Sequence, residues 1–344
     1  MKISFNNTFL KILFFLVLIS GLKITSDLSN KGFIVLSQLL VIPPLFISIL
    51  FLRKVKKSFI LGLFGFVAIS LINGSSYGSI ILISINILIY MILDKRYDYE
   101  KVNQFLNRQF FFFTILFLIL LALFTKIFEV DNDIWINPSK FLPWDRLRLF
   151  MFEPSYLGML IAPLLFFRVK TVLKMILTFT IVLTQSYLSY LYALVLLLLK
   201  SRVMTYLLFL IGFLLVLYLY AMPIKLFWQN SGIIRFIGVK LFTDFGEISV
   251  IKLLIGHGLG SGDKLLQSYF LTYGVEIANG FLFSAIYDLG LIAFLFLIRI
   301  FVRNIKELFL ILVLLLNFSF GNILFVAIFF ISKIMLSQRS GVSK

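Results

Sequence analysis

The sequence contains no cysteine and only one histidine in 344 residues. The absence of cysteine excludes disulfides, thiolate catalysis, iron–sulfur clusters and cysteine-ligated zinc, and one histidine excludes a histidine-rich metal site within the chain. Charged residues are also scarce, at 14% against roughly 25% in a soluble domain. We therefore expect neither a metal nor a cofactor, and the sequence does not predict a soluble redox enzyme.

Apolar residues are present in excess, at 61% of the chain, and the mean hydropathy is +1.07. A helix that spans a bilayer needs about 20 mostly apolar residues, so the chain has room for about ten to twelve spans. We predict an all-α polytopic integral membrane protein with about 12 (10–12) transmembrane helices, which forms a single membrane domain over residues 1–344.

Twelve apolar runs indicate where the spans lie. They cover approximately residues 9–22, 32–52, 58–73, 79–93, 110–128, 150–167, 171–185, 187–199, 203–222, 280–298, 307–318 and 321–336. Hydropathy alone leaves ten to twelve spans open, because 171–199 and 307–336 are each long enough for one tilted helix or for two short ones. Polar residues at 184–186 and 317–322 favour turns there, and hence twelve spans.

The basic residues predict the orientation. Lys and Arg number 32 against 15 Asp and Glu, and they lie in short groups at the ends of the apolar runs. A cytoplasmic N-terminus places most of them in cytoplasmic connections, as the positive-inside rule requires, and twelve spans make the C-terminus cytoplasmic as well. This placement explains the net charge of +17 without nucleic acid as a partner.

On this topology two external connections stand out, the first external loop at 129–149 and a much longer one at 223–279. Binding and catalytic residues concentrate in loops that a scaffold holds in place. A transporter instead collects polar groups at mid-membrane and commonly shows internal repeats, and no repeat period is visible in this sequence. The long extracytoplasmic loop therefore favours an enzyme over a transporter.

The first external loop leads into a carboxylate at the membrane surface. Arg146 and Arg148 come shortly before Glu153 and Pro154. Proline and a carboxylate both suit the first turn of a helix, so one interpretation is simply a helix start. The other is a site for a polar anionic substrate, because charges of both signs collect where the chain has few.

The long loop carries Arg235 and a glycine-rich stretch at 256–262 with the sequence Gly-His-Gly-Leu-Gly-Ser-Gly. Successive glycine N–H groups can cradle phosphate oxygens, although such a stretch also suits an ordinary turn, and the lack of a βαβ pattern excludes a dinucleotide site. Histidine titrates near neutral pH. His257 is therefore either a candidate base or a residue packed in a turn.

Asp288 follows this loop and lies within the apolar run 280–298. Intramembrane carboxylates are costly and are functional candidates by default. A structural pairing with a neighbouring helix explains the residue equally well.

The order of these motifs resembles the O-antigen polymerase and O-antigen ligase (Wzy-like) family of bacterial polysaccharide polymerases. The similar segments are Arg148 with Glu-Pro-Ser at 153–155, Leu-Thr-Gln-Ser at 183–186, Gly-His-Gly-Leu-Gly-Ser at 256–261, Ala-Asn-Gly-Phe at 278–281 and Asp-Leu-Gly-Leu-Ile at 288–292. The resemblance covers mainly residues 140–300. The spacing from Arg235 to Gly246 is also similar to one in the polymerase branch.

Two positions depart from the family pattern. Tyr187 stands where many members have arginine, and Ala278-Asn279 stands where ligases tend to have histidine and asparagine. The second departure argues against a ligase.

The resemblance implies a membrane glycosyltransferase of the bacterial cytoplasmic (inner) membrane. It would join undecaprenyl diphosphate-linked oligosaccharide repeat units at the outer face into O-antigen, capsule or exopolysaccharide. The alternatives are an O-antigen ligase of the same family and a lipid-linked oligosaccharide flippase or other transporter. Expected partners are the lipid-linked oligosaccharide and membrane lipids, with a flippase and a chain-length regulator as further candidates.

The implied chemistry assigns roles to individual residues. Arg148 and Arg235 are expected to clamp the diphosphate, because a guanidinium binds two oxygens at once. Glu153 and His257 are the candidate catalytic bases, and Glu153 alternatively orients an arginine. The remaining expected substrate-binding residues are Arg146, Tyr156, Gln185, Gly258, Gly260 and Asn279.

Overall fold

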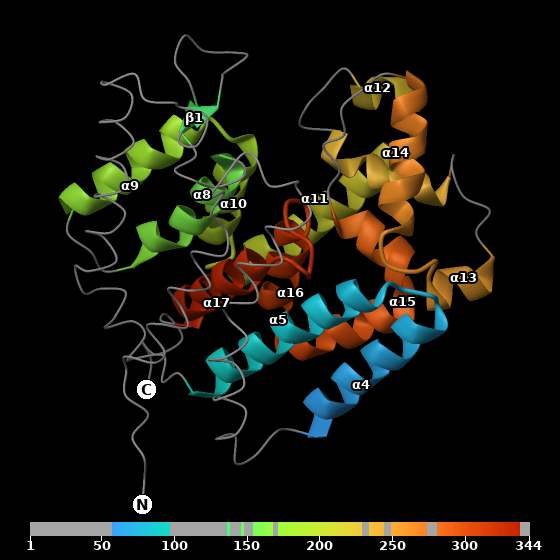
Figure 1. Ribbon diagram of the computed structural model, residues 1–344. Coiled ribbons are helices and arrows are strands. Elements are labelled where there is room, and N and C mark those ends of the chain that lie inside the picture. The colour runs from blue at the N-terminus through green and yellow to red at the C-terminus, as the bar shows by residue number, and fades with distance from the viewer. Residues whose placement is uncertain are drawn as a thin grey trace, which may run out of the picture. The chain divides into compact units, whose positions relative to one another are not determined.

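The computed structural model describes residues 57–96, 136–137, 146–147, 154–167, 171–228, 234–243, 249–273 and 281–337 (Figure 1). These residues are mostly helical. Three predicted runs, 9–22, 32–52 and 110–128, lie outside them. Each of the other runs coincides with a helix.

The described elements follow one another as a series of helices with one short β-hairpin. They are α4 (Lys57–Ile72), α5 (Tyr77–Arg96), β1 (Ile136–Asn137), β2 (Arg146–Leu147), α8 (Pro154–Ile161), η2 (Ala162–Phe166), α9 (Thr171–Thr184), α10 (Tyr187–Leu198), α11 (Arg202–Ala221), α12 (Ile224–Trp228), η3 (Ile234–Phe242), α13 (Val250–Ile255), α14 (Ser261–Tyr273), α15 (Phe281–Phe301), α16 (Ile305–Leu314) and α17 (Ile323–Ser337).

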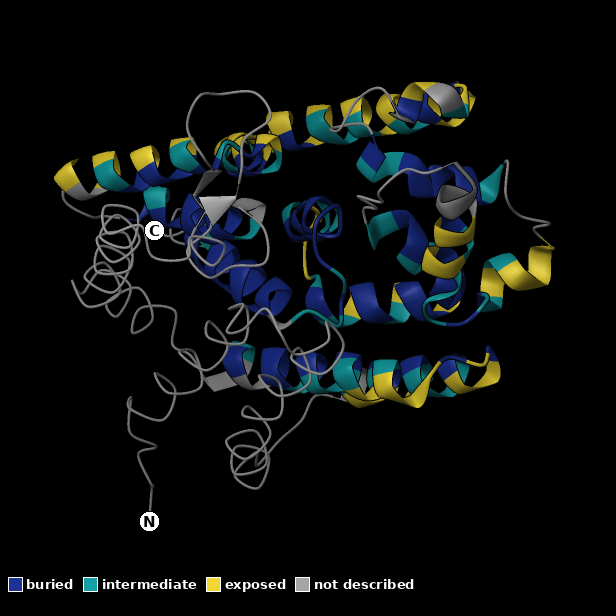
Figure 2. Cartoon of the chain, turned by 45° about the horizontal axis from the view of Figure 1, so that its top comes forward, coloured by how far each residue is buried: buried dark blue, intermediate teal, exposed yellow. Residues whose placement is uncertain are grey.

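Two of the described helices, α11 and α15, are long and apolar enough to cross a membrane. Helix α11 has 20 residues, and such a helix is about 30 Å long. Most of its large apolar side chains are exposed, whereas α17 is almost wholly buried (Figure 2). An exposed apolar helix surface of this kind is compatible with an integral membrane protein.

The helix boundaries have local causes. Helix α8 begins at Pro154, as the helix-start interpretation of this segment predicts. Helices α9 and α10 are separated at Gln185, whose φ is +46°. The polar stretch 317–322 separates α16 from α17, so both turns predicted from the sequence are present. Asn304 caps the start of α16, because its side-chain Oδ1 accepts the backbone N–H of Glu307. The Glu307 carboxylate in turn accepts the backbone N–H of Arg303.

The chain divides into two compact units. Unit 1 comprises Met1–Phe51, Met91–Leu197 and Val326–Lys344. Within it α8 packs against α9, and β1 and β2 pair antiparallel with Asn137 opposite Arg146. Two polar contacts reach the α17 segment of this unit. Tyr192 Oη lies 2.8 Å from Ser332 Oγ, and Lys333 Nζ lies 3.2 Å from Asp94 Oδ1.

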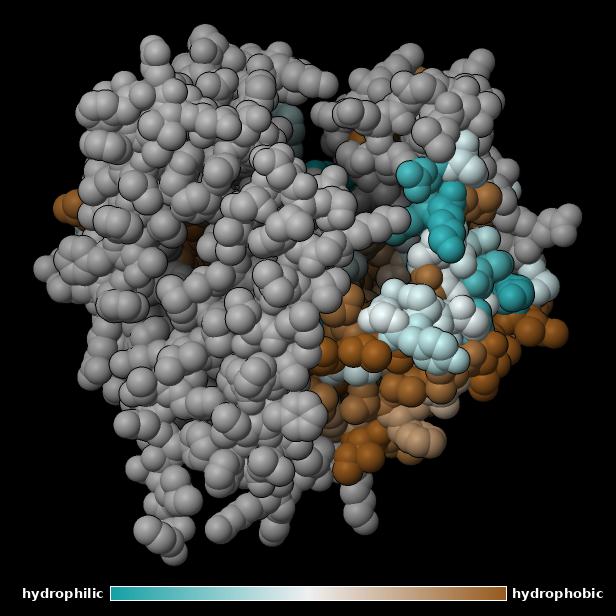
Figure 3. Space-filling model, viewed as in Figure 1, coloured by the Kyte–Doolittle hydropathy of each residue, from teal (hydrophilic) through white to brown (hydrophobic). Residues whose placement is uncertain are grey.

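Unit 2 comprises Leu52–Tyr90 and Leu198–Phe325. Helix α4 packs along α15 (Figure 1). The two helices are antiparallel, because Gly62 lies against Ile300, Gly65 against Phe296, and Asn73 reaches the carbonyl of Asp288. On the face seen in Figure 3 the described surface is apolar around α4 and becomes more hydrophilic toward α14.

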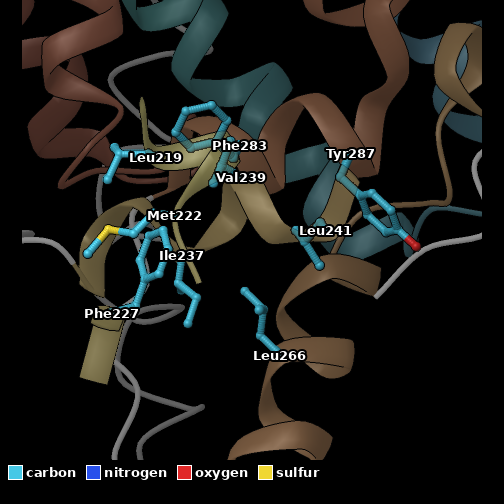
Figure 4. Close-up of a cluster of buried hydrophobic side chains, with 9 residues drawn as sticks. All are labelled: Leu219, Met222, Phe227, Ile237, Val239, Leu241, Leu266, Phe283 and Tyr287. Atoms are coloured by element: carbon cyan, nitrogen blue, oxygen red, sulfur yellow. The ribbon is translucent and has the colours of Figure 1, made fainter. Parts of the chain in front are cut away.

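The segment predicted as a long loop is folded over its described residues. It contains α12, η3, α13 and α14. A hydrophobic cluster joins α12, η3 and α14 to α11 and α15 (Figure 4). The cluster consists of Leu219, Met222, Phe227, Ile237, Val239, Leu241, Leu266, Phe283 and Tyr287. A search for spans of about 20 apolar residues misses such short elements, so the sequence indicated only a loop. We call the described residues 224–228, 234–243 and 249–273 the helical cap.

Candidate functional site

The helical cap meets α15 where the backbone of that helix is broken. Gly290 has φ +72° and ψ +165°, which is not helical. Gly256 of the glycine-rich stretch has φ +92° and lies against Gly290. A Cβ atom on either glycine would collide with the backbone of the other segment. Only glycine at both positions therefore allows the two backbone segments to pass this close to each other.

The break in α15 frees backbone carbonyls, and the glycine-rich stretch satisfies them. The carbonyl oxygen of Tyr287 accepts the N–H of His257 at 3.2 Å, and that of Asp288 accepts the N–H of Gly258 at 2.9 Å. The side-chain amide of Asn73 donates to the same Asp288 carbonyl at 3.2 Å. Unpaired backbone groups are costly away from water, so these bonds stabilise the junction.

The buried Asp288 carboxylate is held by two further glycine N–H groups. Its Oδ2 accepts the N–H of Gly260 and its Oδ1 accepts the N–H of Gly262, each at 2.7 Å. Both donors lie at the N-terminus of α14, where a negative charge is favourable. A structural role, in which Asp288 pairs with a neighbouring helix, thus accounts for this buried carboxylate. Of the glycine N–H groups expected to cradle a phosphate, those of Gly258, Gly260 and Gly262 donate to Asp288 instead.

His257 is held in one orientation by Tyr287. Its ring stacks on the Tyr287 ring, with centroids 3.9 Å apart and an interplanar angle of 1°, and its Nδ1 lies 3.2 Å from the Tyr287 carbonyl oxygen. A carbonyl only accepts hydrogen bonds, so we assign the proton of the neutral ring to Nδ1. Nε2 then carries the lone pair and can accept a proton.

Two polar residues that the sequence analysis overlooked complete the junction. Asn73 donates to the carbonyl of Ile255 at 3.0 Å and accepts the hydroxyl of Ser75 at 2.6 Å. The Ser75 hydroxyl in turn accepts the N–H of Leu259 at 2.9 Å. The signal was present as Asn-Gly-Ser-Ser at 73–76, between two apolar runs.

Arg235 belongs to the same helical cap and is fixed by an amide. It lies near the start of η3 and is half-buried, and its Nη1 donates to Oδ1 of Asn317 at 2.7 Å. Asn317 is 1% exposed and lies in the turn between α16 and α17. A guanidinium has five N–H donors in a planar fork, and the bond to Asn317 orients this group.

A second cation of η3 has a structural partner. Lys240 is buried, and its Nζ donates to the carbonyl oxygen of Tyr220 at 3.0 Å. Tyr220 lies in the last turn of α11, where unpaired carbonyls favour a positive charge. The bond fixes η3 to the end of α11.

The remaining predicted residues belong to unit 1 or lie outside the described residues. Glu153, Arg148 and Asn279 are outside the described residues. Arg146 is in β2, with its side chain outside the description, Tyr156 is half-buried in α8, and Gln185 forms the turn after α9. The geometry thus brings together His257, Gly258 and Gly260, and it holds Arg235 elsewhere in the same cap.

Among the described residues, no group of three or more His, Asp and Glu side chains is placed to hold a metal ion. Comparison of the chain with protein-family models, with curated proteins and with solved structures finds no match.

Proposed function

We propose that this protein is a polymerase that joins undecaprenyl diphosphate-linked oligosaccharide repeat units into a surface polysaccharide at the outer face of the bacterial cytoplasmic membrane. One observation carries the proposal. A folded cap that holds an anchored arginine and an oriented histidine lies at one end of the apolar helices α11 and α15.

The charges at the other end of unit 2 support an external cap. Helix α11 begins with Arg202, and α15 carries Arg299 in its last turn. The start of α16 joins this end, because Lys306 Nζ donates to the carbonyl of Lys200 at 3.2 Å. A basic end is the cytoplasmic one under the positive-inside rule. The cap then faces outward, where lipid-linked repeat units are polymerised in the family that the sequence resembles.

The proposed reaction is a glycosyl transfer to a sugar hydroxyl. The acceptor oxygen forms a bond to the anomeric carbon of the donor, the bond from that carbon to the diphosphate breaks, and undecaprenyl diphosphate leaves. His257 Nε2 takes the hydroxyl proton as general base. The guanidinium of Arg235 offsets the negative charge that develops on the leaving diphosphate. Arg148 and Glu153 keep their proposed roles as second clamp and as alternative base.

The test is complementation of a deletion strain, with polymer length read on a gel and protein level read on a blot. Arg235→Ala should abolish long chains at an unchanged protein level, and Arg235→Lys should restore them only in part, because a point charge does not reproduce the fork. Arg148→Ala should behave in the same way. Lys252→Ala is the matched control, since it removes an exposed cation of the cap.

The result that would overturn the proposal is a normal polymer from both alanine variants. Loss of polymer from the Lys252 control as well would attribute the effect to net charge rather than to a clamp.

A further inference from the structure

A groove at the basic end of unit 2 combines an apolar wall with positively charged side chains. It runs from the second half of α15 to the start of α16 and has a volume of about 740 Å³. Leu295, Phe296 and Leu308 contribute to its apolar wall, and Arg299 and Arg303 lie at its polar end. This volume falls within the range of about 300–1,000 Å³ that small-molecule sites occupy.

The polar end of the groove is strongly positive. Arg299 and Arg303 are exposed, and Lys306 lies in the first turn of α16. The pKa of Lys306 is lowered, first by burial and then by the charge of Arg202. No acidic residue lines the groove within the described part of the chain.

Glu307, which follows the two arginines in the chain, lies in the first turn of α16. Glu307 is buried, and its carboxylate accepts the backbone N–H of Arg303 at 2.8 Å and the side-chain amide of Asn304 at 3.1 Å. Its charge therefore lies at the start of α16.

The apolar wall lies on a helix that is able to span a bilayer. Helix α15 is one of the two candidate spans, and Leu295 on the groove is 61% exposed. One turn further along the chain, Arg299 marks the change from apolar to charged surface. A molecule that fits has an apolar chain and an anionic group at one end.

We propose that this groove binds an anionic phospholipid of the bilayer, with an acyl chain along Leu295 and Phe296 and the phosphate between Arg299 and Arg303. Basic pockets between membrane helices on the cytoplasmic side recognise anionic lipid headgroups, and a guanidinium binds phosphate oxygens through paired N–H donors. The proposal does not depend on the polymerase function.

The experiment measures lipid retention by the purified full-length chain in detergent, with native mass spectrometry. Cardiolipin is the anionic probe and phosphatidylcholine is the uncharged comparison. The wild type should retain cardiolipin at least ten-fold better than phosphatidylcholine. The double variant Arg299→Gln/Arg303→Gln should lose at least ten-fold of this retention, and raised salt should weaken it in the wild type.

Two matched variants separate this site from general charge and from misfolding. Lys252→Gln/Lys264→Gln removes two exposed cations from the helical cap and should keep cardiolipin. Leu295→Asp places a carboxylate on the apolar wall and should lose cardiolipin, whereas Val250→Asp, at an exposed apolar position of α13, should keep it. Each variant is compared by its thermal midpoint without lipid.

Equal cardiolipin retention by the wild type and by the Arg299/Arg303 variant would overturn the proposal. Equal loss in the Lys252/Lys264 variant would also overturn it, because binding would then follow net charge. If the arginine variant fails to fold, the Leu295→Asp variant provides the test. Unchanged cardiolipin retention in that variant would reject the groove as the binding site.

Discussion

Gly256 and Gly290 lie against each other with no room for a side chain between them, and both have a positive φ. The contact joins the helical cap to the break in α15. His257 and Asp288 both lie within two residues of this contact, so the position of the candidate base depends on it.

Substitution of either glycine by alanine should destabilise the protein. A positive φ costs about 1–3 kcal/mol for a residue with a Cβ, and overpacking adds a similar amount. Gly256→Ala and Gly290→Ala should therefore lower the thermal midpoint in detergent markedly. Gly78→Ala is the control, because a Cβ there meets nothing within 4 Å. Thermal midpoints equal to that of the wild type in both variants would contradict the close contact between Gly256 and Gly290.

Asp288 should contribute stability rather than chemistry. Asp288→Ala removes the acceptor for two N–H groups, at about 1–3 kcal/mol for each group left unpaired. Asp288→Asn keeps one acceptor oxygen and should be the milder change. Both effects should appear in the thermal midpoint. If Asp288→Asn retains full stability but makes no polymer, the carboxylate has a catalytic role that we have not assigned.

Asn317 should act through Arg235. Asn317→Ala removes the acceptor that orients the guanidinium, so polymer chains should shorten while protein level holds, and Asn317→Asp should preserve them better because it keeps an acceptor oxygen. Asn322→Ala serves as the control, since that side chain instead accepts the N–H of Leu324 at the start of α17. The polymer ladder is the readout. Equal shortening in the control would indicate a general effect of the 317–322 turn.

The two candidate bases should respond unequally. His257→Ala should lose the polymer, because the ring that takes the proton is gone, and Glu153→Gln should retain some, because an amide still accepts a hydrogen bond from an arginine. Polymer length after complementation measures both. The opposite result, with normal chains from His257→Ala and none from Glu153→Gln, would transfer the base role to the carboxylate.

The chain has no cysteine, so single cysteines report the orientation cleanly. Asp263→Cys in the cap should react with a membrane-impermeant maleimide in intact cells. Arg202→Cys, at the start of α11, should react only after permeabilisation. Both positions are exposed. Labelling in the reverse order would place the cap in the cytoplasm and remove the basis for polymerisation by it.

The sequence by itself determined where the described helices outside the cap form and where they stop. Apolar runs and polar turns are patterns of a few neighbouring residues, and they determine helix boundaries locally. The separation of α9 from α10 at Gln185 and of α16 from α17 at 317–322 was therefore predictable. The same local view missed the cap, whose short helices become stable only by packing on the ends of α11 and α15. It also left open whether Asp288 was functional or structural.

Only the tertiary structure decided which polar groups meet. Asn73 and Asp288 are 215 positions apart in the chain, and Arg235 and Asn317 are 82 apart. No local pattern specifies such pairs, because each is fixed by how α4, η3 and the 317–322 turn pack within unit 2. From the sequence, a carboxylate within an apolar run, such as that of Asp288, carries a high free-energy cost. The N–H groups of Gly260 and Gly262 offset this cost, and they become its donors only when α14 and α15 are packed together.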